Sequence, residues 1–201
     1  MSEGVDENKR ATLRRFAALG AATSLTGLLE QPASGDVGVR EAILGYLNTV
    51  PGAHFSKLRD DLQLGTGETQ HHVQRLVEMG AITSRRDGDY RRFFPADRFT
   101  ATEQVALGYL RRETPRGMVL ELLETPSATG GELATALDVS SSTISKHAAE
   151  LAEAGLLERE NGYALTRPEL LLVLLLRYAD SFDERTVAFA ARAADLIEFS
   201  E

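Results

Sequence analysis

The chain has 201 residues, of which 43% are hydrophobic and 26% charged, a composition typical of a globular protein with a substantial core. It contains no cysteine, which excludes disulfides, thiolate metal sites and cysteine catalysis. The formal net charge is −8, which argues against binding nucleic acid through bulk positive charge. Only Lys9, Lys57 and Lys146 are lysines. An acidic, lysine-poor chain suits a salt-rich, halophile-like cytoplasm, but a GC-rich genome, which favours arginine codons, predicts the same bias.

Residues 1–34 are predicted to form an N-terminal helical arm. An uncharged stretch, Phe16–Leu29, follows an Arg-Arg pair and resembles a twin-arginine export signal. Acidic residues precede the pair, and no run in the chain approaches the roughly 20 apolar residues of a spanning helix. We therefore favour a cytoplasmic protein whose arm docks on its own body or on a partner, with no membrane association. The basic residues of the arm are Lys9, Arg10, Arg14 and Arg15.

The sequence repeats itself after 75 residues. When Ile43–Ile82 is compared with the segment 75 positions later, nine of 40 positions are identical and the apolar positions stay in register. The chain is therefore predicted to hold two copies of one structural unit. The identical pairs are Leu47/Leu122, Pro51/Pro126, Ala53/Ala128, Leu58/Leu133, Leu62/Leu137, His72/His147, Leu76/Leu151, Glu78/Glu153 and Gly80/Gly155.

Each copy is predicted to form three helices and a β-hairpin. A proline ends the first helix, and leucines at i and i+4 mark a short second one. Small polar residues (Gly65–Gly67 or Ser140–Ser142) form a turn that caps the third helix, which Gly80 or Gly155 ends in a left-handed conformation. The dipeptides Asp87-Gly88 and Asn161-Gly162 then predict type I′ hairpin turns.

This order of elements is that of a winged helix-turn-helix domain. The segment Leu133–His147, followed by Leu151–Leu157, resembles MarR- and ArsR-type transcription regulators, and the first copy resembles them more loosely. The predicted fold class is mainly α with small β-hairpin wings, as two tandem winged helix-turn-helix domains plus N- and C-terminal helices. Beyond the arm, the predicted divisions are domain 1 (35–98), a linker helix (99–113), domain 2 (114–167) and C-terminal helices (168–201).

The resemblance implies that the third helix of a domain enters the DNA major groove and that the wing contacts the backbone. Glutamine is suited to this role because its amide pairs with adenine in a bidentate manner. The predicted DNA-binding residues of domain 1 are Thr66, Glu68, Gln70, His71 and Gln74 on the helix and Arg85, Arg86, Arg91 and Arg92 on the wing. Those of domain 2 are Ser140, Ser141, Ser142, Thr143, Ser145, Lys146 and Arg159.

Several of these assignments have a structural alternative. The wing arginines also suit a solvated strand edge, paired with Asp87 and Asp89. The serines suit a simple helix cap, and the paired histidines at 72 and 147 suit half-buried packing positions. A metal site at His71-His72 with Glu68 is disfavoured because adjacent helical residues diverge by about 100°.

Charge distinguishes the two copies. Residues 35–98 hold nine cations and nine anions, whereas residues 114–167 hold four and eight and residues 168–201 hold three and seven. The wing arginines therefore make domain 1 the better candidate for phosphate contact.

We interpret the chain as a sequence-specific transcriptional regulator whose partner is double-stranded promoter DNA. The alternative is a winged-helix adaptor that binds proteins and not DNA. Phosphate-loop, zinc-protease and serine-hydrolase motifs are missing, so no enzymatic activity, metal or cofactor is expected.

The C-terminal helices are expected either to complete the second core or to form a homodimer seam. Seven consecutive apolar residues, Leu170–Leu176, cover more than one helix face, which favours both roles. A last amphipathic helix is expected from about Asp183 to Phe199. The residues expected to share its apolar side are Val187, Ala190, Ala191, Ala194 and Ile197.

Overall fold

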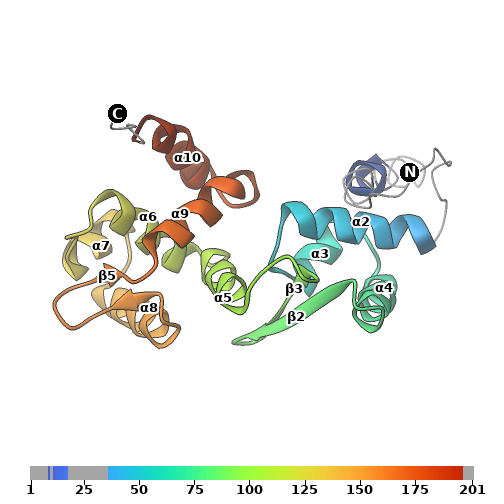
Figure 1. Cartoon of the computed structure of the whole chain (residues 1–201), viewed down its shortest axis with the longest axis horizontal. Coiled ribbons are helices and arrows are strands. Elements are labelled where there is room, and N and C mark those ends of the chain that lie inside the picture. The colour runs from blue at the N-terminus through green and yellow to red at the C-terminus, as the bar shows by residue number, and fades with distance from the viewer. Residues whose placement is uncertain (1–8, 10, 18–35, 197–201) are drawn as a thin grey trace. The chain divides into compact units, whose positions relative to one another are not determined.

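The structure is a computed structural model that describes residues 9, 11–17 and 36–196 (Figure 1). The chain divides into two compact units, Met1–Thr100 and Ala101–Glu201, which we describe separately. The described residues are mostly helical with small antiparallel sheets, which confirms the predicted fold class.

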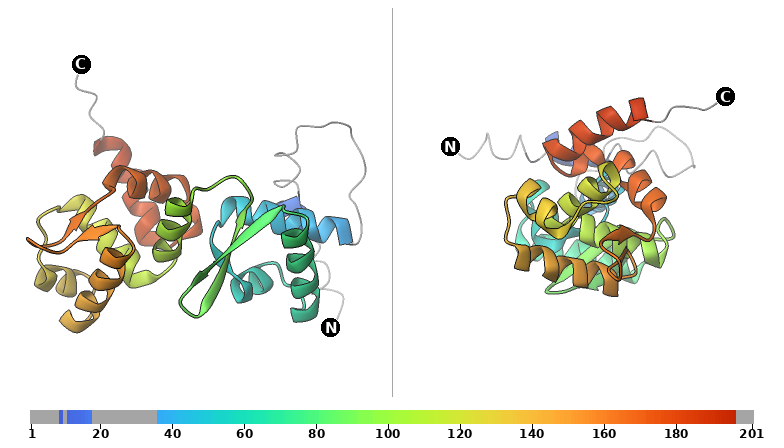
Figure 2. Two further views of the ribbon diagram at one scale, coloured as in Figure 1. Left: turned by 60° about the horizontal axis from the view of Figure 1, so that its bottom comes forward. Right: turned by 90° about the vertical axis from the view of Figure 1, so that its left-hand side faces the viewer.

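From Asp36 onward, the part of the first unit that the structure describes contains three helices and a three-stranded antiparallel sheet of order β1-β3-β2. Figure 2 shows the long β2-β3 hairpin of this sheet in green. A further helical segment, which we call the N-terminal helix, comprises residues 9 and 11–17. The other elements are α2 (Asp36–Thr49), β1 (Ala53–His54), α3 (Phe55–Asp61), α4 (Thr66–Glu78), β2 (Ile82–Asp87) and β3 (Tyr90–Pro95).

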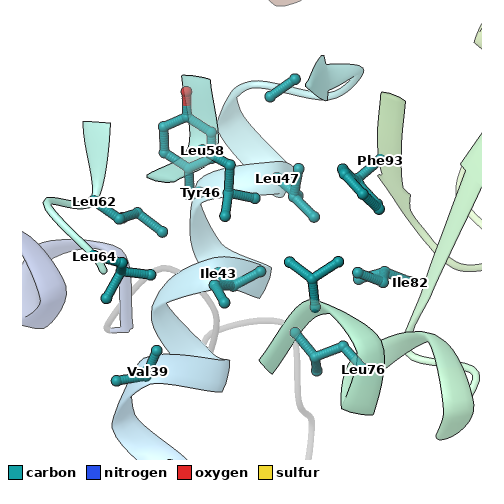
Figure 3. Packing of buried hydrophobic residues seen from close by; sticks show 12 residues of the cluster. Val39, Ile43, Tyr46, Leu47, Leu58, Leu62, Leu64, Leu76, Ile82 and Phe93 are labelled. Carbon is teal, nitrogen blue, oxygen red and sulfur yellow. The ribbon is translucent and has the colours of Figure 1, made fainter. Parts of the chain in front are cut away.

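Helix α2 lies at the centre of the first core (Figure 3). Its inward residues follow helical spacing, so one stripe of α2 meets α3, α4 and the sheet at once. The N-terminal helix adds Leu13 and Phe16 to the edge of this core, and the Phe16 ring meets the Tyr46 ring edge-on at 5.2 Å. The central residues are Val39, Ile43, Tyr46, Leu47, Leu58, Leu62, Val73, Leu76, Ile82 and Phe93.

The second unit repeats this plan and adds helices at both ends. The helix predicted as a linker packs against α6 and α9 and buries Leu107 and Leu110 completely, so it contributes to the second core. The elements are α5 (Ala101–Leu110), α6 (Glu113–Glu124), α7 (Gly130–Ala136), α8 (Ser141–Glu153), β4 (Leu157–Glu158), β5 (Ala164–Leu165), α9 (Pro168–Arg177), the 3₁₀ helix η1 (Ala179–Ser181) and α10 (Glu184–Leu196).

The 75-residue repeat holds in backbone detail. Helices α3 and α7, and α4 and α8, start and end 75 residues apart. Gly80 and Gly155 end the third helices with φ of 67° and 69°, which confirms the predicted left-handed caps. The turn before each third helix also has a left-handed residue, Gln63 or Asp138, with φ of 54° and 51°. Sequence reasoning did not predict these two, because neither is a glycine.

Both predicted hairpin turns are wrong in detail. Asp87 pairs with Tyr90, so the first turn consists of Gly88 and Asp89, with glycine first at φ 58°, as a type II′ turn requires. In the second copy Glu158 pairs with Ala164, which leaves residues 159–163 as a five-residue loop. The second wing is therefore much shorter than the first.

The last helix buries a different face from the predicted one. Among the side chains of α10 that the structure describes, Thr186, Phe189 and Ala193 are buried, whereas Val187 is 42% exposed. Ala194 and Ile197 lie outside these described side chains. Burying one phenyl ring removes more apolar area from water than burying a valine and alanines, so Phe189 sets the rotation of the helix. The buried hydroxyl of Thr186 donates to the Asp183 carboxylate at 2.6 Å, so this polar group keeps a hydrogen-bond partner inside the protein.

A buried arginine joins α6 to the start of α10. Arg116 is 7% exposed; it donates to the Leu110 carbonyl at 2.8 Å and to the Asp183 carboxylate. Asp183 also accepts the Thr186 amide at 2.9 Å, so it caps α10. Partial burial alone would raise the pKa of Asp183, but the hydrogen bonds from Arg116 and Thr186 lower it below its ordinary value.

We expect Asp183→Ala to lower the free energy of unfolding of the second unit by about 2 kcal/mol, because it removes a helix cap and leaves the buried Arg116 charge without its carboxylate. Denaturant unfolding measures this. The folded-state pKa is depressed, so the deficit is full above about pH 4 and disappears as the pH falls through that lower pKa. The control is Asp180→Ala, at an exposed position; equal losses in both variants would contradict the role of Asp183.

Candidate nucleic-acid interface

Helix α4 has one buried stripe and one exposed face. Thr69, His72, Val73 and Leu76 are buried at i, i+3, i+4 and i+7, which fixes the rotation of the helix about its axis. The predicted contact residues Thr66, Gln70, His71 and Gln74 are all exposed, with Thr66 at the start of the helix and the other three on the side away from the buried stripe. The unit therefore presents this polar face to solvent as a single surface.

Sequence reasoning missed Arg75 on the same helix. Its side chain is exposed, and Nη1 lies 3.4 Å from a Glu78 carboxylate oxygen. Gln74 donates to the other Glu78 oxygen at 3.0 Å. The signal was available, because Arg75 lies one helical turn after the exposed His71.

Glu68 lies at the edge of the exposed face of α4, and its carboxylate already accepts hydrogen bonds from within the unit. It accepts the Gly65 amide at 3.2 Å, which closes a capping box, and the Lys9 amine at 2.9 Å. Partial burial alone would raise the pKa of Glu68, but the bonds from Lys9 and the Gly65 amide lower it below its ordinary value. Glu68 is thus a capping residue, and the prediction of a direct DNA contact is not favoured.

The wing carries three exposed arginines rather than four. Arg85, Arg86 and Arg91 are exposed. Arg92 is only 3% exposed; it donates to the Asp87 carboxylate and to the Gly52 carbonyl at 3.0 Å. The prediction that Arg92 contacts phosphate is corrected on this ground, because a buried guanidinium paired within the domain cannot reach a ligand. The sequence held no signal for this burial, because Phe93 and Phe94 are both buried and period-two alternation therefore does not separate Arg92 from Arg91.

Strand pairing divides the exposed arginines between the two faces of the wing. Arg86 pairs with Arg91, so these two share a face, and Arg85 lies on the other face opposite Arg92. Arg91 donates through Nε to the Ser84 hydroxyl at 2.8 Å, and Arg86 through Nε to the Gly88 carbonyl at 3.3 Å. A guanidinium has further donors on its two terminal nitrogens. These bonds therefore orient both side chains and leave donors available for a ligand.

In the second unit the serine run does cap the helix. The Ser140 hydroxyl accepts the Thr143 amide at 3.1 Å and lies 2.8 Å from the hydroxyl oxygens of both Ser142 and Thr143. Ser141, Ser142 and Ser145 are exposed on α8, and Thr143 is half-buried.

Acidic residues accompany the few cations of the second unit. The Lys146 amine lies 4.0 Å from a Glu150 carboxylate oxygen. Arg159 is exposed in the short wing, directly between Glu158 and Glu160. The same scaffold therefore carries an arginine-rich wing in the first unit and a wing with one arginine and two glutamates in the second.

The described residues hold no group of three His, Cys, Asp or Glu side chains that could bind a metal ion. His71 is exposed whereas His72 is buried, and the two rings meet edge-on with their centroids 5.1 Å apart. Among the helices described, none is long and apolar enough to cross a membrane.

Two family models match the chain. Residues 37–107 match a model described as an N-terminal HTH domain, and residues 118–164 match a model described as an HTH domain. Neither a curated protein nor a solved structure matches the chain significantly. The first matched segment begins within α2 and continues past β3 into α5, and the second begins within α6 and ends at the start of β5. The chain therefore contains two tandem helix-turn-helix domains whose mostly helical structure, with small antiparallel sheets, is consistent with winged helices.

Proposed function

We propose that this protein is a sequence-specific, DNA-binding transcriptional regulator whose first helix-turn-helix unit makes the main DNA contact. The observation that carries the proposal is that the exposed polar face of α4 and the exposed arginines of the wing belong to one compact unit. Regulation follows from occupancy of promoter DNA. The finer relation to MarR- and ArsR-type regulators and the cytoplasmic location are part of this proposal.

The two surfaces have different roles in the proposed complex. Helix α4 lies in the major groove, where Gln70 and Gln74 hydrogen-bond base edges. Arg85, Arg86 and Arg91 contact phosphates, which sets the position of the unit but carries no sequence information. The buried Arg92 supports the wing by joining β3 to Asp87 and to the Gly52 carbonyl.

The second unit has a secondary role in this proposal. Its exposed serines, Lys146 and Arg159 contact DNA only after the first unit has bound, because the surrounding acids repel phosphates. The rival function is a protein-binding adaptor, which the acidic surface of the second unit favours. The two differ in outcome: an adaptor binds no DNA duplex at any salt concentration.

Replacing the three exposed wing arginines (Arg85→Ala, Arg86→Ala and Arg91→Ala together) is expected to weaken DNA binding. Each lost phosphate contact makes the plot of log affinity against log salt shallower by about 0.9, so the triple variant loses about 2.7 in slope. Fluorescence anisotropy on a duplex, together with genome-wide occupancy of the tagged protein, measures the loss.

The matched control removes three exposed arginines of the second unit (Arg167→Ala, Arg177→Ala and Arg192→Ala) and should keep the wild-type slope. An unchanged slope in the wing variant, or equal losses in both, contradicts the proposed wing contact. Absence of binding by the wild type would favour the adaptor.

Gln70→Ala is expected to relax the sequence preference at one base pair, with a loss of about 1–3 kcal/mol of discrimination and little change in the salt slope. In vitro selection with the variant and the wild type measures this. The control is Glu153→Ala, at the equivalent exposed position at the end of α8, which should leave the selected sequence unchanged. Identical motifs for the wild type and Gln70→Ala would refute the role of Gln70 in base recognition.

Homodimerisation through the C-terminal helices is the remaining part of the proposal. Leu171, Leu174 and Leu175 are buried within the second unit, whereas Val173 on the same helix is 56% exposed, which supports a second apolar face. Light scattering is expected to give the mass of a dimer for the wild type and of a monomer for Val173→Lys. A monomeric wild type would count against this seam.

A further inference from the structure

The N-terminal helix is anchored to the first unit at three successive positions. Lys9, Leu13 and Phe16 are spaced at i, i+4 and i+7, so they lie on one face of the helix. The Lys9 amine bonds Glu68 of α4, Leu13 packs against the core, and Phe16 meets Tyr46 of α2. One ionic and two apolar contacts therefore hold this helix to α4 and α2.

The ionic contact changes the charge at the start of α4. Glu68 is the acidic residue of the first turn, where a free carboxylate would repel a phosphate and offset the positive end of the helix dipole. The amine of its partner Lys9 lies 2.9 Å from the carboxylate, and the two side chains are only 28% and 34% exposed. The docked helix thus neutralises an acid next to the polar face of α4.

The docked helix leaves the recognition face open. Thr66, Gln70, His71 and Gln74 are exposed while Lys9 and Leu13 make their contacts. A lid over α4 would bury some of these residues, so the arrangement does not fit an autoinhibitory role. On the N-terminal helix itself, Arg14 and Arg15 are exposed on the side away from the anchoring residues.

We infer that the N-terminal helix is a third DNA-contacting element, which holds Arg14 and Arg15 against the phosphate backbone beside α4. This inference rests on the proposed function of the first unit. It also gives the arginine pair a role that neither helix-turn-helix domain requires. The helix must stay docked on the first unit for its arginines to reach the duplex that α4 and the wing contact. We call this arrangement the docked brace.

The test uses the full-length chain and a mixed-sequence duplex of about 30 base pairs, three helical turns. Replacing both arginines (Arg14→Ala and Arg15→Ala) is expected to make the salt slope shallower by about 1.8, at 0.9 for each contact. Both side chains are exposed, so the thermal unfolding curve should stay unchanged.

A second variant tests the docking. Leu13→Asp keeps both arginines but places a charge against the core, so the helix should detach and the slope should fall by the same amount. A loss in the arginine variant without a loss in Leu13→Asp overturns the docked-brace inference, as does tighter binding by either variant, which would indicate a lid. The control pair Arg167→Ala and Arg177→Ala should leave the slope unchanged, and an equal loss there also overturns it.

The failure of this inference can be told apart from the failure of the proposed function. If the wild type binds the duplex and the wing variant loses slope while the Arg14 and Arg15 variant does not, only the N-terminal helix is excluded. If the wild type does not bind the duplex at low salt, both proposals fail together.

Discussion

The buried stripe of α4 is the constraint on which the rest of the first unit depends. Thr69, His72, Val73 and Leu76 must face the core formed by α2, α3 and the sheet, and this burial fixes the rotation of α4. A rotation by one residue, about 100°, would expose the apolar stripe and bury the glutamines of the opposite face, each without a hydrogen-bond partner. The polar face is therefore a consequence of core packing, and its residues can vary without affecting the fold.

The two copies show how one scaffold supports different surfaces. Their helix boundaries, left-handed turn residues and glycine caps agree at a spacing of 75 residues. These are the positions where backbone geometry limits the choice of residue. The wings are not limited in this way. The first wing has six paired positions and exposed arginines, whereas the second has two paired positions and a single arginine between acidic residues. Function in the two units is accordingly expected to diverge through the wings.

For the proposed DNA binding by a chain with a net charge of −8, the positions of the arginines matter more than their number. Arg92 and Arg116 are buried and hold elements together through Asp87 and Asp183, so neither adds to a binding surface. Arg85, Arg86 and Arg91 remain exposed on the wing. Phosphate attraction depends on such local concentrations of charge, and salt screens exposed charges far more than buried pairs.

The sequence alone determined the repeat, the order of the helices, the glycine caps and the segment that carries each wing, because these depend on local periodicity and backbone preference. Tertiary structure decided the rest. Whether Arg92 is buried depends on Asp87 and on the Gly52 carbonyl, 40 residues away in sequence, and the rotation of α10 depends on where Phe189 finds a core. The contact between Lys9 and Glu68 joins residues 59 positions apart. Such pairings arise only when separate elements pack, since a one-dimensional pattern gives the spacing of side chains along an element but not the neighbours that surround them.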